Sequence, residues 1–363
     1  MSRPALLDKL FQAGEWLLKP GLVPIDDVTI KRNQTTVYVA LDALIRQGGG
    51  LAVGQDKRIY VDFSLMPTDT FEDLLKSIRV PVWLTKNLTI YVATTGSDTL
   101  DEGRGLTEDK PFATLQAALQ YVTDTYNVSN YIVTVRVEAG DYGLSETTLP
   151  DYTSSTGFII ITGSTANAAD TLLGRIRSVA TKTYRIQNLT ARTADTSVAV
   201  ISPITADSTG IVEILGCISD ISTVSVGSGG VYGTYSNKGG SISIVATADT
   251  SAVTGLVINA GTNTIRAFIG AAASSKITIN ADLTLQGSPT MTEGAASCNN
   301  GYIAFGRTSP ANPGRFPQVN VTGSPNGRRY YAYLNGIINT NGQGPDFLPG
   351  STEGVTATGG QYA

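Results

Sequence analysis

Carboxylates, tyrosines and arginines are the side chains of this sequence that could do chemistry, because the chain contains no histidine. Without histidine there is no Ser-His-Asp or Cys-His arrangement and no ordinary base that titrates near neutral pH. Four acidic residues occur in the β-rich stretch 211–290, namely Glu213, Asp220, Asp249 and Asp282. An enzyme built on this chain would use such carboxylates in pairs, as glycoside hydrolases do.

Paired-carboxylate hydrolysis sets narrow distances. A glycoside hydrolase that inverts the anomeric configuration needs two carboxyl groups about 6.5–9.5 Å apart, and one that retains it needs them about 5–5.5 Å apart. Neighbouring strands lie about 4.8 Å apart, so carboxylates at one register of adjacent coils would meet this condition. Glu213 stands in the strand-like string IVEIL, where an ordinary charge on an outward strand face fits equally well. Asp220 and Asp249 lie in Ser/Thr-rich corners, where Asp is a common turn residue. The sequence therefore commits no residue to catalysis.

A second group of candidate residues follows the turn at 324–327. It consists of Arg328, Arg329, Tyr330, Tyr331 and Tyr333. Tyrosines offer flat surfaces on which sugar rings stack, and arginines bind acidic groups of a glycan. Two interpretations stay open: a receptor-binding patch, or a strand of a trimeric C-terminal cap whose tyrosines pack between chains.

Metal and cofactor sites are not expected. The acidic residues 98, 101, 102 and 109 lack the alternating spacing of a calcium loop, and Asp98 and Asp101 suit a tight turn. Cys217 and Cys298 belong to no CxxC pair, and we expect both to be buried and reduced. The predicted cofactor set is therefore empty.

The elements that position these side chains are mainly strands. Clusters of β-branched residues recur at 132–137, 158–162, 184–189, 211–215, 242–246 and 277–285. Their onsets are about 26 residues apart at first and about 30 or more later, which is typical of a solenoid. Thr and Val suit a pleated, stacked surface, and Gly and Asn suit its corners. The pattern predicts a right-handed parallel β-helix, with a β-sandwich as the alternative.

Helices are expected at the start of the chain and just before the coils. Leucines and one phenylalanine repeat at helical spacing over 6–18, which predicts an amphipathic helix. Its apolar face would pack either in the core of one chain or in a bundle of several chains. Further helices are expected over 37–46 and 70–78, with a strand at 58–65 between them. A helix over 111–122 would cover the N-terminal end of the solenoid, because exposed strand edges need a cap.

Charge separates the N-terminal region from the β-rich region, and composition argues against nucleic-acid-binding and membrane proteins. Residues 1–86 hold eleven of the 26 Lys and Arg residues, whereas 193–306 hold three. A net charge of −4 leaves no overall positive field for nucleic acid. Apolar runs are far shorter than the roughly 20 residues of a membrane span, and residues 1–18 lack a secretory h-region. We expect neither nucleic-acid binding nor membrane insertion.

Three segments carry a family resemblance. The string YVATTGSDTLDEGRGLTEDKPFATLQAAL (91–119) resembles the opening of pectate-lyase-like β-helices in bacteriophage tail fibres and tailspikes. The upstream string at 48–84 looks like a module that precedes this opening in phage tail fibres. The C-terminal string FLPGSTEGVTATGGQYA (347–363) is similar to endings of phage and prophage tail proteins. Similar openings also occur on bacterial surface proteins and polysaccharide lyases.

The resemblance implies a homotrimeric virion protein, made in the host cytoplasm and located in the phage tail. It implies a virion-attachment module (1–88) that docks on other tail or baseplate proteins, and a strand-turn-helix cap (89–130). A parallel β-helix (131–290) and an irregular β C-terminal cap or receptor-contact region (291–363) would follow. The expected function is structural, with attachment to a host-surface glycan. A glycan depolymerase is the alternative, and a bacterial surface adhesin is a third possibility weakened by the missing signal sequence.

Overall fold

The computed structural model describes residues 51–53, 59–61, 81–193, 200–224, 230–246, 254–306 and 316–363, and these form two units. The first unit comprises 1–83 and 124–127. Its described strands are the antiparallel pair β1 (Leu51–Val53) and β2 (Ile59–Val61), and the parallel pair β3 (Val82–Trp83) and β5 (Tyr126–Asn127). Strand β2 falls inside the strand expected at 58–65. The helices expected over 6–18, 37–46 and 70–78 lie outside the described residues.

The second unit (84–123 and 128–363) is built from three long parallel sheets. The ten-stranded sheet contains β4 (Leu88–Val92), β6 (Ile132–Val137), β9 (Phe158–Gly163), β12 (Thr183–Gln187), β16 (Ile211–Leu215), β19 (Ser241–Ile244), β23 (Lys276–Ile279), β27 (Tyr302–Phe305), β31 (Ile337–Asn339) and β33 (Gln361–Tyr362). The seven-stranded sheet contains β7 (Gly140–Asp141), β10 (Thr171–Leu173), β13 (Thr190–Arg192), β17 (Cys217–Asp220), β20 (Thr254–Asn259), β24 (Asp282–Gln286) and β28 (Val319–Thr322).

The third sheet is nine-stranded and completes each coil. It contains β8 (Thr147–Leu149), β11 (Ile176–Ser178), β14 (Val200–Ile201), β15 (Ile204–Asp207), β18 (Gly230–Asn237), β22 (Ala267–Ala272), β26 (Ala296–Asn299), β30 (Tyr330–Tyr333) and β32 (Val355–Thr356). A short parallel sheet at one corner contains β21 (Thr264–Ile265), β25 (Thr290–Met291) and β29 (Asn326–Gly327). A short 3-10 helix, η2 (Ala168–Asp170), precedes β10.

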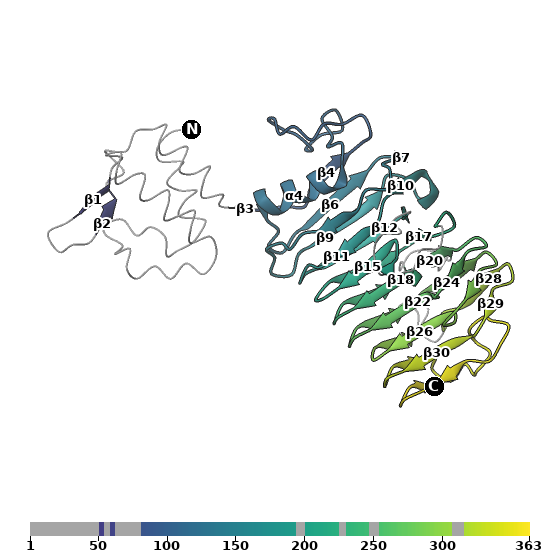
Figure 1. Cartoon of the computed structure of the whole chain (residues 1–363). Helices are drawn as coiled ribbons and strands as arrows, with labels where there is room; N and C mark the ends of the chain where they lie inside the picture. The colour runs from purple at the N-terminus through teal and green to yellow at the C-terminus, as the bar shows by residue number, and fades with distance from the viewer. Residues whose placement is uncertain are drawn as a thin grey trace. The chain divides into compact units, whose positions relative to one another are not determined.

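The chain forms a parallel β-helix, as the sequence predicts. It passes from the ten-stranded to the seven-stranded and then to the nine-stranded sheet, and it returns to the ten-stranded sheet one coil further on (Figure 1). Every strand of these sheets pairs in parallel with the equivalent strand of the next coil, as between β12 and β16. The observed pairing therefore excludes the β-sandwich, whose strands are antiparallel.

The core of the β-helix is a stack of identical or similar side chains. In the ten-stranded sheet one inward register position reads Ile161, Ile186, Ile214, Ile244 and Ile279 in successive coils, and all five are fully buried. Burying a side chain of this size contributes roughly 1.5–3 kcal/mol. The period-2 alternation that predicts each strand thus also builds the core.

Helix α4 (Leu115–Thr125) lies beside the first coils and overlaps the range where a helix is expected (Figure 1). Its apolar face, which includes Leu119 and Val122, is buried in the same cluster as Ile90 of β4. The helix begins at Leu115, later than the sequence suggests, because Thr114 caps it: the Thr114 hydroxyl accepts from the Ala117 backbone N–H at 3.2 Å. Asp98 accepts from the backbone N–H groups of Ala113 and Thr114 at 2.9 and 3.0 Å and so fixes the turn before the helix. Asp98 is thus a structural turn residue.

The coils do not stop at the expected boundary near residue 290. Strands β26, β27 and β28 pair in parallel with the preceding coil, and β30, β31, β32 and β33 extend the same sheets. Aromatic side chains pack between these last coils: Tyr330 stacks on Tyr362 at 3.7 Å between centroids, and Phe347 packs against Phe305 at 5.0 Å. Most of 291–363 is therefore solenoid.

We predict that the β-helix loses stability in alkaline solution. Burial raises the pKa of Tyr142, Tyr235 and Tyr362 to about 12, whereas an unfolded tyrosine titrates near about 10. Between these values the unfolded state binds fewer protons than the folded state, so stability falls as pH rises from about 10 to about 12. Burial also raises the pKa of Cys217 to about 12 and of Cys298 to about 11, whereas an unfolded cysteine titrates near about 8.5, so the two thiols add to this loss of stability from about pH 8.5 upward. Below about pH 8 little change is expected, because the chain has no histidine.

Urea unfolding from pH 6 to 12, followed together with tyrosinate absorbance, tests this expectation. A steep stability change between pH 6 and 8 would contradict it.

Candidate ligand-binding surface

The outer face of the nine-stranded sheet carries a column of residues in register. Tyr235 of β18 pairs with Gly270 of β22, which pairs with Ser297 of β26, and this in turn pairs with Tyr331 of β30. The two tyrosines are three strand steps apart, roughly 14 Å at about 4.8 Å per step. Two small residues thus separate two aromatic positions on one face.

Each aromatic position is a pair of stacked tyrosines. Tyr232 and Tyr235 have ring centroids 4.6 Å apart at 28°, and Tyr331 and Tyr333 have centroids 4.5 Å apart at 22°. The first pair needs the glycine beside it, because a Cβ on Gly270 would lie 2.5 Å from two ring atoms of Tyr232. Tyr232 and Tyr235 are only 3% and 8% exposed, whereas Tyr331 and Tyr333 are half-buried. The first pair is therefore a buried stack, and the second pair is the aromatic surface that a ligand can reach.

Glu293 anchors the first tyrosine pair. Its Oε2 accepts hydrogen bonds from the Tyr232 hydroxyl at 3.2 Å and from the Ser297 hydroxyl at 2.6 Å, and its Oε1 lies 3.4 Å from Arg266 Nε. Burial, reinforced by the Glu293 charge, raises the pKa of Tyr232. Tyr232 therefore stays protonated and fixed in orientation at physiological pH.

A depression of about 600 Å³ lies beside this column, where the nine-stranded sheet turns toward the ten-stranded one. We call it the amide trough. Its lining consists of Tyr235, Asn237, Ala272, Ala273, Asn299, Asn300, Leu334, Asn335 and Thr358. None of these side chains is charged. Asn299 also hydrogen-bonds the hydroxyl of Tyr333, which connects the trough to the second tyrosine pair.

The corner residues of the trough adopt the left-handed backbone conformation. Ala273, Asn300 and Asn335 have φ values of 51°, 48° and 63°, and they occupy the turns of successive coils. Asparagine tolerates this conformation better than most residues do. The turn geometry of the solenoid thus brings a row of side-chain amides to one edge of the sheet.

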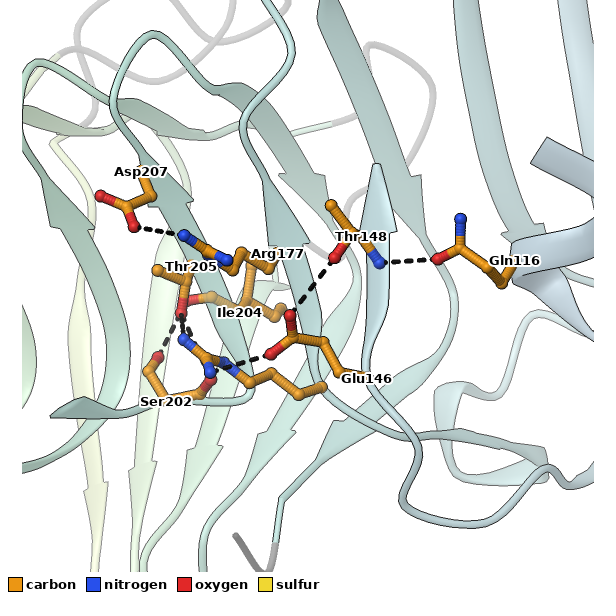
Figure 2. A network of polar contacts seen from close by, with 9 residues as sticks. Gln116, Glu146, Thr148, Arg177, Ser202, Ile204, Thr205 and Asp207 are labelled. Carbon is orange, nitrogen blue, oxygen red and sulfur yellow. Dashed lines mark hydrogen bonds and ion pairs between the residues drawn. The ribbon is translucent and has the colours of Figure 1, made fainter. Parts of the chain in front are cut away.

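A separate network of polar side chains lies on the nine-stranded sheet, near the N-terminal end of the β-helix. Figure 2 shows Glu146 pointing toward Thr148, whose backbone N–H donates to Gln116 of α4 at 2.8 Å, and Arg177 pointing toward Asp207. Glu146 also pairs with Arg175 at 2.9 Å, and the Arg175 side chain is only 11% exposed. These charges pair with one another, so this part of the face is structural.

The carboxylates considered for catalysis are spread over two sheets. Glu213 of β16 lies on the ten-stranded sheet and binds Arg185 through Oε2 at 2.7 Å. Asp220 and Asp282 lie on the seven-stranded sheet, where Asp220 accepts from the Ser222 backbone at 2.9 Å and Asp282 accepts from the Gln318 backbone at 2.8 Å. Asp249 lies outside the described residues. Glu213 thus forms an ion pair, and Asp220 and Asp282 bind backbone groups.

A smaller depression of about 280 Å³ adjoins Glu213. It is lined by Phe158, Lys182, Arg185 and hydroxyl residues of the 154–156 turn, among others. Lys182 donates to the carbonyl of Ser154 at 3.1 Å, and Arg185 lies over the Phe158 ring at 5.1 Å. Its charged groups are therefore engaged with the protein.

The C-terminal Arg/Tyr group divides into two parts. Tyr331 and Tyr333 face outward, and the Arg328 guanidinium lies 5.4 Å from the Tyr331 ring centroid. Tyr330 instead stacks on Tyr362 against the core, and Arg329 pairs with Asp346 at 3.2 Å. The alternation of a single strand separates residues that are adjacent in sequence.

Sequence reasoning missed Tyr232, Tyr235, Gly270 and the amides of the trough. The string VYGTY at 231–235 carries a signal, since two tyrosines flank a glycine in a stretch that is otherwise rich in small residues. The coil register is needed to bring Tyr235 into one column with Tyr331, almost a hundred positions later.

Comparison with known proteins finds no matching family model, no similar curated protein and no similar solved structure. Within the described ranges, no helix is long and apolar enough to span a membrane. The same ranges contain no group of three or more acidic or cysteine side chains placed to hold a metal ion.

Proposed function

We propose that this chain is a structural bacteriophage tail fibre or tailspike protein that attaches the virion to a glycan on the host surface. The observation that carries the proposal is the half-buried stack of Tyr331 and Tyr333 beside the amide trough, on one face of a parallel β-helix. Aromatic faces pack against the apolar faces of sugar rings, and amides both donate to and accept from sugar hydroxyls. The phage assignment itself rests on the sequence resemblance of 48–84, 91–119 and 347–363.

The proposed role is attachment without cleavage. Glu213, Asp220 and Asp282 already serve as acceptors within the fold, and Glu293 accepts from two hydroxyl groups and faces Arg266. Hydrolysis needs two carboxyl groups facing one bond across a gap of about 5–9.5 Å. Because these carboxylates already form hydrogen bonds and ion pairs within the protein, we favour a binding role over a depolymerase.

Attachment predicts that host binding depends on the outward tyrosines. Changing Tyr331 to alanine removes one ring of a stacked pair, and we expect it to weaken binding to host cells roughly 10-fold, since a surface aromatic of this kind contributes about 1–2 kcal/mol. Tyr302, on the ten-stranded sheet, provides the matched control, and its alanine variant should bind like wild type. Binding is measured with fluorescent protein on a panel of hosts, with sugar release assayed in parallel.

Release of reducing ends or unsaturated products by the wild-type protein would contradict the attachment role. Unchanged binding by the Tyr331→Ala variant would remove the second tyrosine pair from the proposed surface.

We further propose a homotrimer, with the region 1–88 docking on other tail or baseplate proteins. An outward column of the seven-stranded sheet supports the trimer, because Leu172, Ile218 and Val257 share one register position, with Thr190 between the first two, and the three apolar residues are only half-buried. An apolar stripe of this kind favours burial against another chain.

Analytical ultracentrifugation should therefore give about three times the chain mass of 38.1 kDa. The Ile218→Lys variant should shift the mass toward one chain. A wild-type mass of a single chain would contradict the trimer.

A further inference from the structure

The amide trough has properties that restrict its ligand beyond the general class of glycan. Its nine lining residues are tyrosine, asparagine, alanine, leucine and threonine. The charged residues near the trough do not line it. Asp207 pairs with Arg177 at 2.8 Å, Arg266 near Tyr235 pairs with Glu293 at 3.4 Å, and Lys238 is exposed. A carboxylate or phosphate entering the trough would lose water without gaining a cation, which is unfavourable.

The trough also offers unused hydrogen-bonding groups. Within the part of the chain that the structure describes, no hydrogen bond occupies the side-chain amides of Asn237, Asn300 and Asn335, all of which line the depression. Each amide provides two donors and one acceptor oxygen. A neutral polyol complements this mixture, because a sugar hydroxyl donates and accepts at once.

The small residue in the floor explains why the depression exists. Asn237 of β18, Ala272 of β22 and Asn299 of β26 occupy successive coils at one outward register position, and Tyr333 follows on β30. Alanine leaves open space between two longer amides. The column from Asn237 to Tyr333 covers three strand steps, roughly 14 Å.

From these observations we infer that the amide trough binds a neutral linear oligosaccharide of about three sugar units, laid along the axis of the coils with Ala272 at the centre. One pyranose unit spans about one coil step, so successive rings meet successive coils. Asn237, Asn300 and Asn335 bind their hydroxyl groups, and Tyr235 packs against a ring at one end. The inference rests on the proposed attachment function and specifies its ligand.

The full-length protein is tested by calorimetry with neutral hexose oligosaccharides of one to six units, drawn from several linkage types. Uronic-acid oligosaccharides of the same lengths serve as the charged comparison. Affinity for the best neutral series should rise up to about three units and then level off, and the matching acidic series should bind at least 10-fold more weakly. Raising the salt concentration from 50 to 500 mM should leave neutral binding unchanged, because no ion pair forms.

Two variants locate the site. Ala272→Trp fills the trough and should reduce affinity at least 10-fold, while Thr278→Trp, an outward position of the next strand β23 on the ten-stranded sheet, should leave it unchanged. Asn300→Ala removes one exposed amide and should weaken binding several-fold. Its thermal unfolding temperature should be only slightly below that of wild type, because alanine is less favourable than asparagine in the left-handed conformation of this position. This variant keeps the test valid if the tryptophan disturbs folding.

The outcomes separate this inference from the proposed function. Host-cell binding that survives both Ala272→Trp and Asn300→Ala would overturn the trough as the site while leaving attachment intact. Stronger binding of the acidic series would overturn the neutral ligand. Loss of all binding to host cells and oligosaccharides by the wild-type protein would refute the attachment function itself.

Discussion

Replacing Ile214 by alanine should lower the free energy of unfolding of the β-helix by about 2–5 kcal/mol, the largest effect of any single substitution considered for this protein. Ile214 is fully buried and lies between Ile186 and Ile244 in the stacked column of the ten-stranded sheet. Removing three carbon atoms leaves a cavity between two coils whose backbones are fixed by parallel pairing. The neighbouring coils cannot close it without losing their register.

Equilibrium unfolding in urea, followed by far-UV circular dichroism, measures the change. The matched control is Ile211→Ala on the same strand, because Ile211 occupies an outward register position and is only half-buried. That variant should lose less than half as much stability. Equal losses at positions 211 and 214 would mean that the inward and outward faces of β16 are wrongly assigned.

The second large effect is expected at Glu146. The Glu146→Ala variant should lose about 1–2 kcal/mol, because the Arg175 guanidinium loses its carboxylate partner. Solvent screens part of this interaction, since the Glu146 side chain is 36% exposed. Arg175 is 11% exposed in its side chain, its Nη1 pairs with Glu146 at 2.9 Å, and its buried Nε has no hydrogen-bond partner. The remaining contact, from Nη2 to the Thr205 hydroxyl, is long at 3.5 Å.

Glu146→Gln distinguishes charge from hydrogen bonding. It retains an acceptor oxygen for Arg175 and should lose about half as much stability as the alanine variant. Glu138→Ala is the control, since its pair with Arg136 is more than a third exposed on both sides and contributes only about 0–1 kcal/mol. Thermal and urea unfolding of all three variants provide the comparison. A Glu138→Ala loss as large as that of Glu146→Ala would contradict the argument.

The fold of the coils could be predicted because it depends on local periodicity. Val, Ile and Thr alternate within strings such as IVTVRV and IVEIL, and those strings recur at an interval that fits one coil. The helix before the coils could also be predicted, since its apolar spacing and the need to cover a strand edge agree. The end of the solenoid could not be located, because the strands beyond 290 are short and separated by Gly- and Asn-rich turns.

The candidate ligand-binding surface could not be predicted, because no local sequence pattern shows which residues of different coils lie side by side. Arg329 and Tyr330 look equivalent to Tyr331 in the sequence. Strand alternation sends Tyr330 into the core, and Arg329, which precedes β30, pairs with Asp346. Tyr235 and Tyr331 belong to different coils, and only the register of four strands places them in one column. The free amides of the trough likewise come from three separate turns.

By itself, the sequence determined the class of fold, the absence of histidine-based chemistry and the burial of the two cysteines, because each follows from composition or from periodicity over a few residues. The tertiary structure alone decided which carboxylates are engaged in the fold and which tyrosines face solvent. It also decided where the coils leave a depression. These properties depend on the register between strands that are about 30 positions apart, and parallel pairing fixes that register only when the whole solenoid has formed.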